Sequence, residues 1–339
     1  MTVPDAQDGS RRRRRGEVTV SAIARLAGVS TPTVSKVLNG RSGIADDTRA
    51  RVEALLRQHG YRRADAEHPA PVVELAFFGL ESNLAVEIMR GVESVVGERG
   101  LAVGFTDLQR AGPRREAAPP RRPTGVIAVH SAYRAVDYAL LGTPTVVVDP
   151  TGEPQHAVPS VGATNWSGGI AAARHLLDLG HRRIAVITGP LGYLCARARL
   201  DASRAAMESA GRPLDPALVR TGRFCFEDGL ELGGQLLALA DPPTAVLCGD
   251  DLQALGVYEA ARRAGVRIPD ALSVVGFDDI EAVRWCGPAL TTVRQPFAAM
   301  GAAAARMVLQ LAAGELVEPA RLELTTSLVV RDSTTGWSS

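Results

Sequence analysis

The stretch from residue 18 to residue 39, VTVSAIARLAGVSTPTVSKVLN, has the pattern of two short helices joined by a tight turn. The first helix is expected to begin after Thr19, whose side chain can cap free backbone N–H groups. Gly28 supplies the turn, and Ser30 is placed to cap the second helix. The apolar positions recur at helical spacing: Val20, Ile23, Ala24, Ala27, Val34, Val37 and Leu38. The stretch predicts a helix-turn-helix, although an ordinary helical hairpin also fits these features.

A third helix is predicted directly downstream, ending before Gly60. Its inner face is lined by Thr48, Val52, Leu55 and Leu56. The three helices form a unit, residues 18–61, that is too small to be the whole protein. The outer face of the second helix carries short hydroxyl and amide groups, which suit contacts to DNA phosphates.

The spacing T-x-x-x-x-A-x-x-A-G-V-S-x-x-T-V-S-x-V-L-N, which begins at Thr19, resembles the N-terminal module of the lactose-repressor (LacI/GalR) family. The resemblance implies that residues 18–61 are a DNA-binding domain. We expect Thr31, Pro32 and Lys36 to read bases, because residues near the start of the recognition helix reach base edges in the major groove. Lys36 is the only lysine in the chain.

Five further residues are expected to position this domain on phosphates: Thr19, Ser21, Ser30, Thr33 and Asn39. For Thr33 and Asn39, helix capping is an alternative role.

Charge is distributed unevenly along the chain. Residues 1–70 carry 13 Lys and Arg against 8 Asp and Glu, whereas the net charge of all 339 residues is +1. A basic head on a mildly acidic body fits DNA contact at one end only. Residues 1–17, with Arg11 to Arg15, are predicted to be a disordered basic tail that adds salt-sensitive phosphate attraction or is merely solvated.

The sequence gives no indication of export, a membrane span or an enzyme. No apolar run follows the basic N-terminus, and none approaches the length of a membrane span. The four cysteines are widely spaced and no His stands at metal-ligand spacing, so we expect free thiols, no metal and no cofactor. G-x-S-x-G, P-loop and H-E-x-x-H motifs are absent from the sequence. These features predict a cytoplasmic, nucleoid-associated protein rather than an enzyme.

From Val72 onward, short apolar runs alternate with amphipathic or Ala-rich stretches. The runs are Val72–Phe78, Leu101–Phe105, Gly125–Val129, Thr145–Val148, Ile184–Thr188, Ala245–Leu247 and Ser273–Phe277. The intervening stretches end at glycines that suit the left-handed position after a helix: Gly100, Gly180, Gly211, Gly265 and Gly314. Strands alternating with helices imply α/β lobes with parallel sheets covered on both faces.

We therefore predict an effector-binding domain over residues 72–332. Its first lobe spans about 72–160 and part of 289–330, and its second spans about 162–288 plus the C-terminal return. Four segments resemble the lactose-repressor family in order and spacing: GHRRIA at 180–185, DDLQALG at 250–256, VGFDDI at 275–280 and PALTTVRQP at 288–296. The resemblance implies the two-lobed fold of type I periplasmic binding proteins, preceded by the all-α helix-turn-helix headpiece.

Polar side chains at the ends of these strands are the candidate effector contacts, because ligands of parallel sheets bind there. Asp149, Asp250 and Asp278 each follow a strand, and Arg199 is expected to open the helix after 184–188. Carboxylates and a guanidinium suit a polyhydroxylated ligand. In the family, positions matching Arg199, Asp250 and Asp278 bind effector, and Phe224 matches an aromatic that packs on the ligand.

Structural roles compete with several of these assignments. Asp149 fits a turn and Phe224 fits the lobe core. One of Asp250 and Asp251 is expected to cap the helix that begins there. Asp279 is expected to cap the following helix rather than to bind anything.

The sequence departs from the family pattern in three places. The linker, residues 62–71, has no leucine to insert into the minor groove and contains Pro69 and Pro71, so we expect a flexible or extended segment instead of a hinge helix. Residues 110–123 contain four prolines and are predicted to form a loop where the family has a helix. Leu84 and Ala85 stand where several relatives place aromatics; Phe77 or Phe78 could compensate, although both also fit a buried strand.

The combined pattern predicts a transcription factor, most simply a repressor, that binds a pseudo-palindromic double-stranded DNA operator as a homodimer. A small effector, expected to be a carbohydrate, would control it allosterically. The C-terminal residues contain no leucine heptad for a tetramer, which favours the dimer. A ligand-binding transport or signalling protein with a vestigial headpiece is the alternative.

Overall fold

The computed structural model describes residues 19–38, 43–59, 71–77, 84–107, 123–129, 142–149 and 158–337. The chain divides into two compact units, residues 1–70 and 71–339. The expectations for the basic tail, Asn39, linker residues 62–70, Phe78 and the 110–122 loop all lie outside the described residues. None of the helices in the described ranges is long and apolar enough to cross a membrane.

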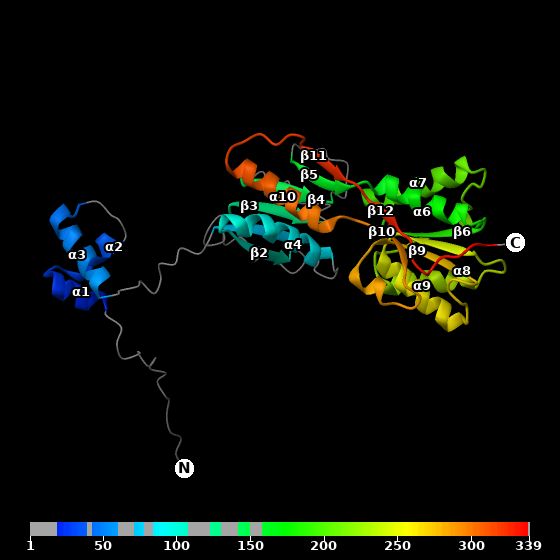
Figure 1. Cartoon of the computed structure of the whole chain (residues 1–339), viewed down its shortest axis with the longest axis horizontal. Coiled ribbons are helices and arrows are strands. Elements are labelled where there is room, and N and C mark those ends of the chain that lie inside the picture. Colours follow the sequence, from blue (N-terminus) through cyan, green and yellow to red (C-terminus); the bar gives the residue numbers. More distant parts are fainter. Residues whose placement is uncertain are drawn as a thin grey trace, which may run out of the picture. The chain divides into compact units, whose positions relative to one another are not determined.

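The N-terminal unit contains three helices, α1 (Val20–Ala27), α2 (Thr31–Leu38) and α3 (Asp46–Gln58) (Figure 1). The Thr19 hydroxyl accepts a hydrogen bond from the Ala22 N–H at 3.2 Å, and the Ser30 hydroxyl accepts one from the Thr33 N–H at 3.3 Å. Gly28 has φ +67°, a value that favours glycine. Six buried side chains join the helices: Ile23, Ala24, Ala27, Val34, Val37 and Val52. The predicted helix-turn-helix is confirmed.

The first lobe is built on a six-stranded parallel sheet with strand order β11-β5-β4-β3-β1-β2. Its strands are β1 (Val72–Phe77), β2 (Ala102–Asp107), β3 (Gly125–Val129), β4 (Thr145–Val148), β5 (Ser160–Ala163) and β11 (Arg321–Leu324). Helix α4 (Leu84–Val96), the short η1 (Gly97–Arg99) and helix α10 (Phe297–Ala312) belong to the same lobe. Apolar strand residues pack against α4 and α10.

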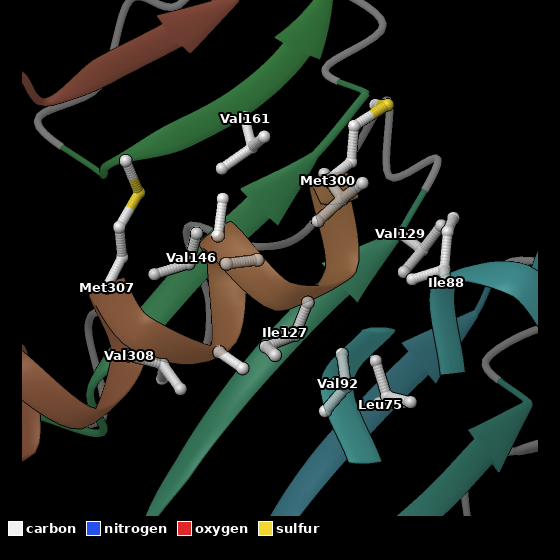
Figure 2. Close-up of a cluster of buried hydrophobic side chains, with 14 of the residues drawn as sticks. Leu75, Ile88, Val92, Ile127, Val129, Val146, Val161, Met300, Met307 and Val308 are labelled. Atoms are coloured by element: carbon white, nitrogen blue, oxygen red, sulfur yellow. The ribbon is translucent and has the colours of Figure 1, made fainter. Parts of the chain in front are cut away.

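Figure 2 shows this packing: Ile127 and Val146 on the strands lie against α10, which carries Met300 and Val308. On α4, Ile88 lies beside Val129 and Val92 lies beside Leu75. Gly91 on α4 and Gly301 on α10 permit a close crossing of the two helices. A Cβ at Gly91 would lie 1.8 Å from the Ala298 carbonyl oxygen, and one at Gly301 would lie 2.1 Å from the Ile88 carbonyl oxygen. The close packing that these glycines permit attaches α10 to the first lobe directly after a chain crossing.

The second lobe has a six-stranded sheet of order β12-β10-β9-β8-β6-β7, in which only the β10–β12 pair is antiparallel. Its strands are β6 (Ile184–Thr188), β7 (Val219–Thr221), β8 (Ala245–Cys248), β9 (Ser273–Asp278), β10 (Thr291–Arg294) and β12 (Ser327–Val329). Its helices are α6 (Asn165–Asp178), α7 (Leu194–Ser209), α8 (Phe226–Leu237) and α9 (Asp251–Ala264), with short 3-10 turns η3 (Pro216–Leu218) and η4 (Glu281–Arg284). The predicted α/β class with parallel sheets is confirmed, and β5, β7, β10, β11 and β12 lie outside the seven apolar runs that the sequence pattern identified.

The chain passes between the lobes three times, after β5, after β10 and after β11. Two of these crossings are hydrogen-bonded to each other: the Thr326 N–H donates to the Thr164 hydroxyl at 2.9 Å, and the Thr326 hydroxyl donates to the Thr164 carbonyl at 3.1 Å. The third crossing runs from Arg294 through Gln295 and Pro296 to Phe297, the first residue of α10. It connects the second-lobe sheet directly to the first-lobe core.

Candidate DNA-binding and effector sites

The outer face of α2 is available for DNA contact. Thr31, Pro32 and Lys36 are exposed, whereas Val34 and Val37 on the same helix are buried in the three-helix core. Among the expected phosphate contacts, Thr19, Ser21 and Ser30 are exposed and Thr33 is half-buried. The Ser30 and Thr33 hydroxyls lie 2.8 Å apart and share a hydrogen bond, so both also stabilise the start of α2. The helix thus presents a cation and several hydroxyl groups from a rigid support.

Arg199 lies at the centre of the candidate effector site, in the second turn of α7. It was expected to open this helix, which instead begins at Leu194. The side chain is only 7% exposed. Its Nε donates to the Asn165 Oδ1 at 2.8 Å and its Nη1 donates to the Gly249 carbonyl at 2.5 Å. The guanidinium also lies over the Phe277 ring, 3.7 Å from its centroid. Arg199 therefore joins the starts of α6 and α9 to the end of β9.

Asp278 is the last residue of β9 and faces Arg199. Its Oδ1 lies 3.7 Å from the Arg199 Nη2 and accepts a hydrogen bond of 2.6 Å from the Gln295 Nε2. The backbone at Asp278 has φ +114°, a conformation that costs a non-glycine residue energy and that clusters at functional sites. Arg199 and Asp278, both candidate effector contacts, thus lie side by side.

Asp250 caps α9, as one of the two adjacent aspartates was expected to do. Its Oδ1 accepts a hydrogen bond from the Gln253 N–H at 2.8 Å. Burial, and secondly the charge of Asp278, raise the pKa of Asp250 to about 7. Asp251 lies deeper: its carboxylate accepts hydrogen bonds from the Ile280 N–H at 2.9 Å and the Thr292 hydroxyl at 2.6 Å, and burial raises its pKa well above the usual value. Asp250 thus caps α9, whereas Asp251 is held by Ile280 and Thr292.

Phe224 forms an aromatic wall next to Arg199. Its ring centroid lies 5.8 Å from the Arg199 guanidinium and 6.3 Å from the ring of Tyr193, against which it stacks. A Cβ at Gly189 would lie 2.1 Å from the Phe224 ring, so only glycine lets the ring lie this close to the backbone. Phe224 is half-buried.

Asp149 brings the first lobe into the site. It follows β4, is 4% exposed and has φ +51°. Cys195 lies at the start of α7, and burial raises the pKa of its thiol to about 12. The charges of Asp149, Arg199 and Asp278 are near enough to affect this pKa as well. Cys195 is therefore a neutral thiol in the wall of the site. All four cysteines are free, as expected.

Asp279 was expected to cap the next helix, and this prediction is wrong. Its buried carboxylate accepts hydrogen bonds from the Arg294 Nε at 2.7 Å and the Arg331 Nη2 at 2.5 Å, and it lies 3.5 Å from the Arg284 Nη2. The Ile280 N–H is bound by Asp251 instead. The reason is that a distant strand and the C-terminal return bring arginines to this position, which local sequence does not reveal.

Three contributors to the site were missed by sequence reasoning. Asn165 follows β5, the strand that was not predicted, so its strand-end position went unnoticed. Phe277 was recognised only as a strand residue. Gln295 lies within the segment PALTTVRQP, but nothing local indicated that it contacts Asp278.

A cavity of about 540 Å³ lies beside Asp278 and Gln295. Leu84, Val86 and Arg90 of α4 line its first-lobe wall, and residues 278–282, 284 and 285 line the opposite wall. Leu84 thus faces the region between the lobes, at a position where several relatives have an aromatic residue. Phe77 is 2% exposed and belongs to the first-lobe core, in agreement with a strand role.

Comparisons with known proteins agree with both halves of this structure. Residues 19–64 match the family described as bacterial regulatory proteins, lacI family, and residues 173–334 match a periplasmic binding protein-like domain. The ribose operon repressor of Escherichia coli (strain K12) is 32% identical over 330 residues, which cover 93% of this chain and 99% of that protein. The HTH-type transcriptional regulator CelR of Thermobifida fusca is 33% identical over 341 residues, covering 94% and 99%.

Two solved structures are similar over nearly the whole chain. The lac repressor dimer bound to operator and the anti-inducer ONPF has a TM-score of 0.74 and 28% identity, covering 94% of this chain and 99% of that one. The CelR–cellobiose complex has a TM-score of 0.71 and 31% identity, covering 94% and 100%. With a relative this similar along its full length, the chain belongs to the lacI family of bacterial regulatory proteins.

Proposed function

We propose that this chain represses transcription by binding a pseudo-palindromic operator as a homodimer, and that a sugar bound between its lobes controls this binding. The observation that carries the proposal is the joint presence of an exposed recognition face on α2 and a buried Arg199–Asp278 pair at the strand ends of the second lobe. One headpiece contacts too few base pairs for useful specificity, so two-fold symmetry is expected. Such a protein acts in the cytoplasm, on DNA of the nucleoid.

On DNA, we assign base contacts to Thr31, Pro32 and Lys36. Lysine can donate to guanine O6 and N7, and proline offers an apolar contact such as that to a thymine methyl. Phosphate contacts are assigned to the hydroxyl and amide groups around them: Thr19, Ser21, Ser30, Thr33 and Asn39. Exposure of the hydroxyl groups near the start of α2 supports this assignment.

In the effector site, we assign ligand contacts to Asp149, Arg199, Phe224, Asp250 and Asp278. The carboxylates and the guanidinium can each make paired hydrogen bonds to neighbouring hydroxyls, and an aromatic wall packs against the apolar face of a sugar ring. Two relatives are named for sugars, the ribose operon repressor and CelR with cellobiose. D-ribose and cellobiose are therefore the first probes to test.

The effector assignment is tested by a thermal-shift screen of D-ribose, cellobiose and other mono- and disaccharides on the full chain. A sugar that raises Tm of the wild type should leave Tm of Arg199→Ala and Asp278→Ala unchanged, because both variants lose ligand hydrogen bonds. The exposed neighbour variant Arg197→Ala should respond like the wild type. A sugar response that survives in Arg199→Ala would exclude this site.

The DNA assignment is tested by gel shifts of the purified protein on inverted repeats and on random duplexes. The repressor role requires a preference for some inverted repeat. Equal affinity for all duplexes would overturn it, whatever the result of the sugar screen.

A further inference from the structure

Gln295 occupies an unusual position between the effector site and the crossing segment that leads to α10. It is 5% exposed and its Nε2 donates to the Asp278 Oδ1 at 2.6 Å. Its Oε1 is the one buried side-chain oxygen or nitrogen in the described ranges that lacks a hydrogen-bond partner. The amide cannot be turned round without directing its oxygen at a carboxylate, which only accepts hydrogen bonds.

This arrangement is therefore unfavourable on both sides of the hydrogen bond. A buried amide oxygen without a donor loses the free energy of its hydration. Asp278 has φ +114°, which is unfavourable for a residue with a Cβ. A pair of residues held in this way is suited to have a second arrangement of similar free energy, which is what a conformational switch requires.

The neighbouring residues connect the same two strands by a second link. Residue 278 pairs with residue 294 in the β9–β10 ladder. Asp279 binds Arg294 at 2.7 Å and also Arg331, which follows β12. The Asp278–Asp279 dipeptide thus contacts the ligand site with one carboxylate. With the other it contacts Arg294, where the β10–α10 crossing begins, and Arg331 in the C-terminal return after β12.

We propose that Gln295 is a positioning residue that transmits the state of the effector site to the first lobe. In the arrangement described here its amide holds Asp278. A ligand hydroxyl that engages the Asp278 carboxylate releases the amide, and the change passes through Pro296 to Phe297, which is buried in the first-lobe core. This inference rests on the proposed function of the site, since it needs a ligand at Asp278.

A reversal of the hydrogen bond tests the proposal without DNA or sugar. Gln295→Glu places two carboxylates in contact, and hydrogen exchange of the amides at 297–301, measured at pH 8 by mass spectrometry on the full chain, should accelerate about tenfold. Adding Asp278→Asn restores a donor and an acceptor in the opposite direction and should return exchange to within about twofold of wild type. Gln310→Glu, on the exposed side of α10, is the matched control and should change nothing.

Rescue by the exchanged pair is a result that a purely space-filling role of Gln295 would not produce. Exchange in the double variant that stays as fast as in Gln295→Glu, or no acceleration in Gln295→Glu, would overturn the proposal. If Gln295→Glu does not fold, Gln295→Met serves instead: it should accelerate exchange, and Asp278→Asn should add nothing to it. If the double variant does not restore slow hydrogen exchange, the repressor role is unaffected. If the gel shifts show no preference for an inverted repeat, the repressor role is excluded, but the hydrogen-exchange result still holds.

Discussion

The headpiece uses different side chains for folding and for recognition, whereas the effector site uses the same side chains for both. In the headpiece, buried Ile23, Val34 and Val52 hold the fold, and the three side chains proposed to read bases lie exposed on α2. In the effector site the same buried side chains do both: Arg199 joins three elements and Asp250 caps α9. A change on the headpiece face should therefore alter DNA binding alone, whereas a change in the effector site should alter ligand binding and stability together.

The strongest way to sharpen this contrast is Arg199→Ala. The change removes hydrogen bonds to Asn165 and Gly249 and leaves Asp278 without its nearest guanidinium. We expect the free energy of unfolding of the 71–339 unit to fall by about 3–5 kcal/mol, the range for breaking a buried ion pair. Chemical denaturation of the full chain measures this, with Arg197→Ala as the exposed control. A fall below about 1 kcal/mol would show that the site is not part of the structural framework.

Ile23→Ala probes the other region. Ile23 is completely buried in the small three-helix core, so its truncation should cost about 3 kcal/mol and unfold much of the headpiece. Operator affinity should be lost while the sugar-induced Tm shift of the body is retained. Circular dichroism and the thermal-shift assay measure the two effects on one sample. Loss of the sugar response would contradict the independence of the two regions.

Asp250→Asn separates charge from capping. Because the pKa of Asp250 is raised to about 7 in the folded protein, the stability that its protonated carboxyl group contributes is complete below about pH 4 and is lost as the pH rises through about 7. Asparagine keeps the cap on the Gln253 N–H without the charge. The variant should match wild type at pH 4 and be more stable at pH 8 by about 4 kcal/mol.

Urea unfolding at the two pH values checks this expectation. The surface variant Asp270→Asn is the control and should show no pH-dependent difference from wild type, since its side chain is 63% exposed. Equal stability of Asp250→Asn and wild type at pH 8 would mean that the carboxylate is not disfavoured by burial.

Lys36→Ala is the mildest change, because the side chain is exposed and supports no core contact. The unfolding free energy should stay within about 0.5 kcal/mol of wild type. Operator affinity should fall by about 1–3 kcal/mol, with relaxed preference at one base pair. Binding titrations against operators substituted at each position distinguish this from a phosphate contact, whose loss would weaken binding uniformly and reduce the salt dependence.

The same contrast explains what the sequence could predict. The headpiece follows from short-range rules. Thr19 and Ser30 each accept a hydrogen bond from the backbone N–H three residues later, and Gly28 makes the turn between the two helices. Strand ends that carry Asp250 and Asp278 were also visible, because their strands are apolar runs. Asp279 and Gln295 were not, because their partners lie 15 to 52 residues away. Such contacts depend on the topology of the crossing segments, for which no local pattern exists.

The central claim is that a ligand bound at the effector site changes DNA binding. Its most direct test uses the inverted repeat enriched by the full chain from random duplexes and the sugar that raises Tm most among those screened, beginning with D-ribose and cellobiose. Titration of the duplex by fluorescence anisotropy, with and without that sugar, should show a change in operator Kd of at least about fivefold. The change should vanish in Arg199→Ala. An operator Kd that is the same with and without a sugar that stabilises the protein would contradict the account.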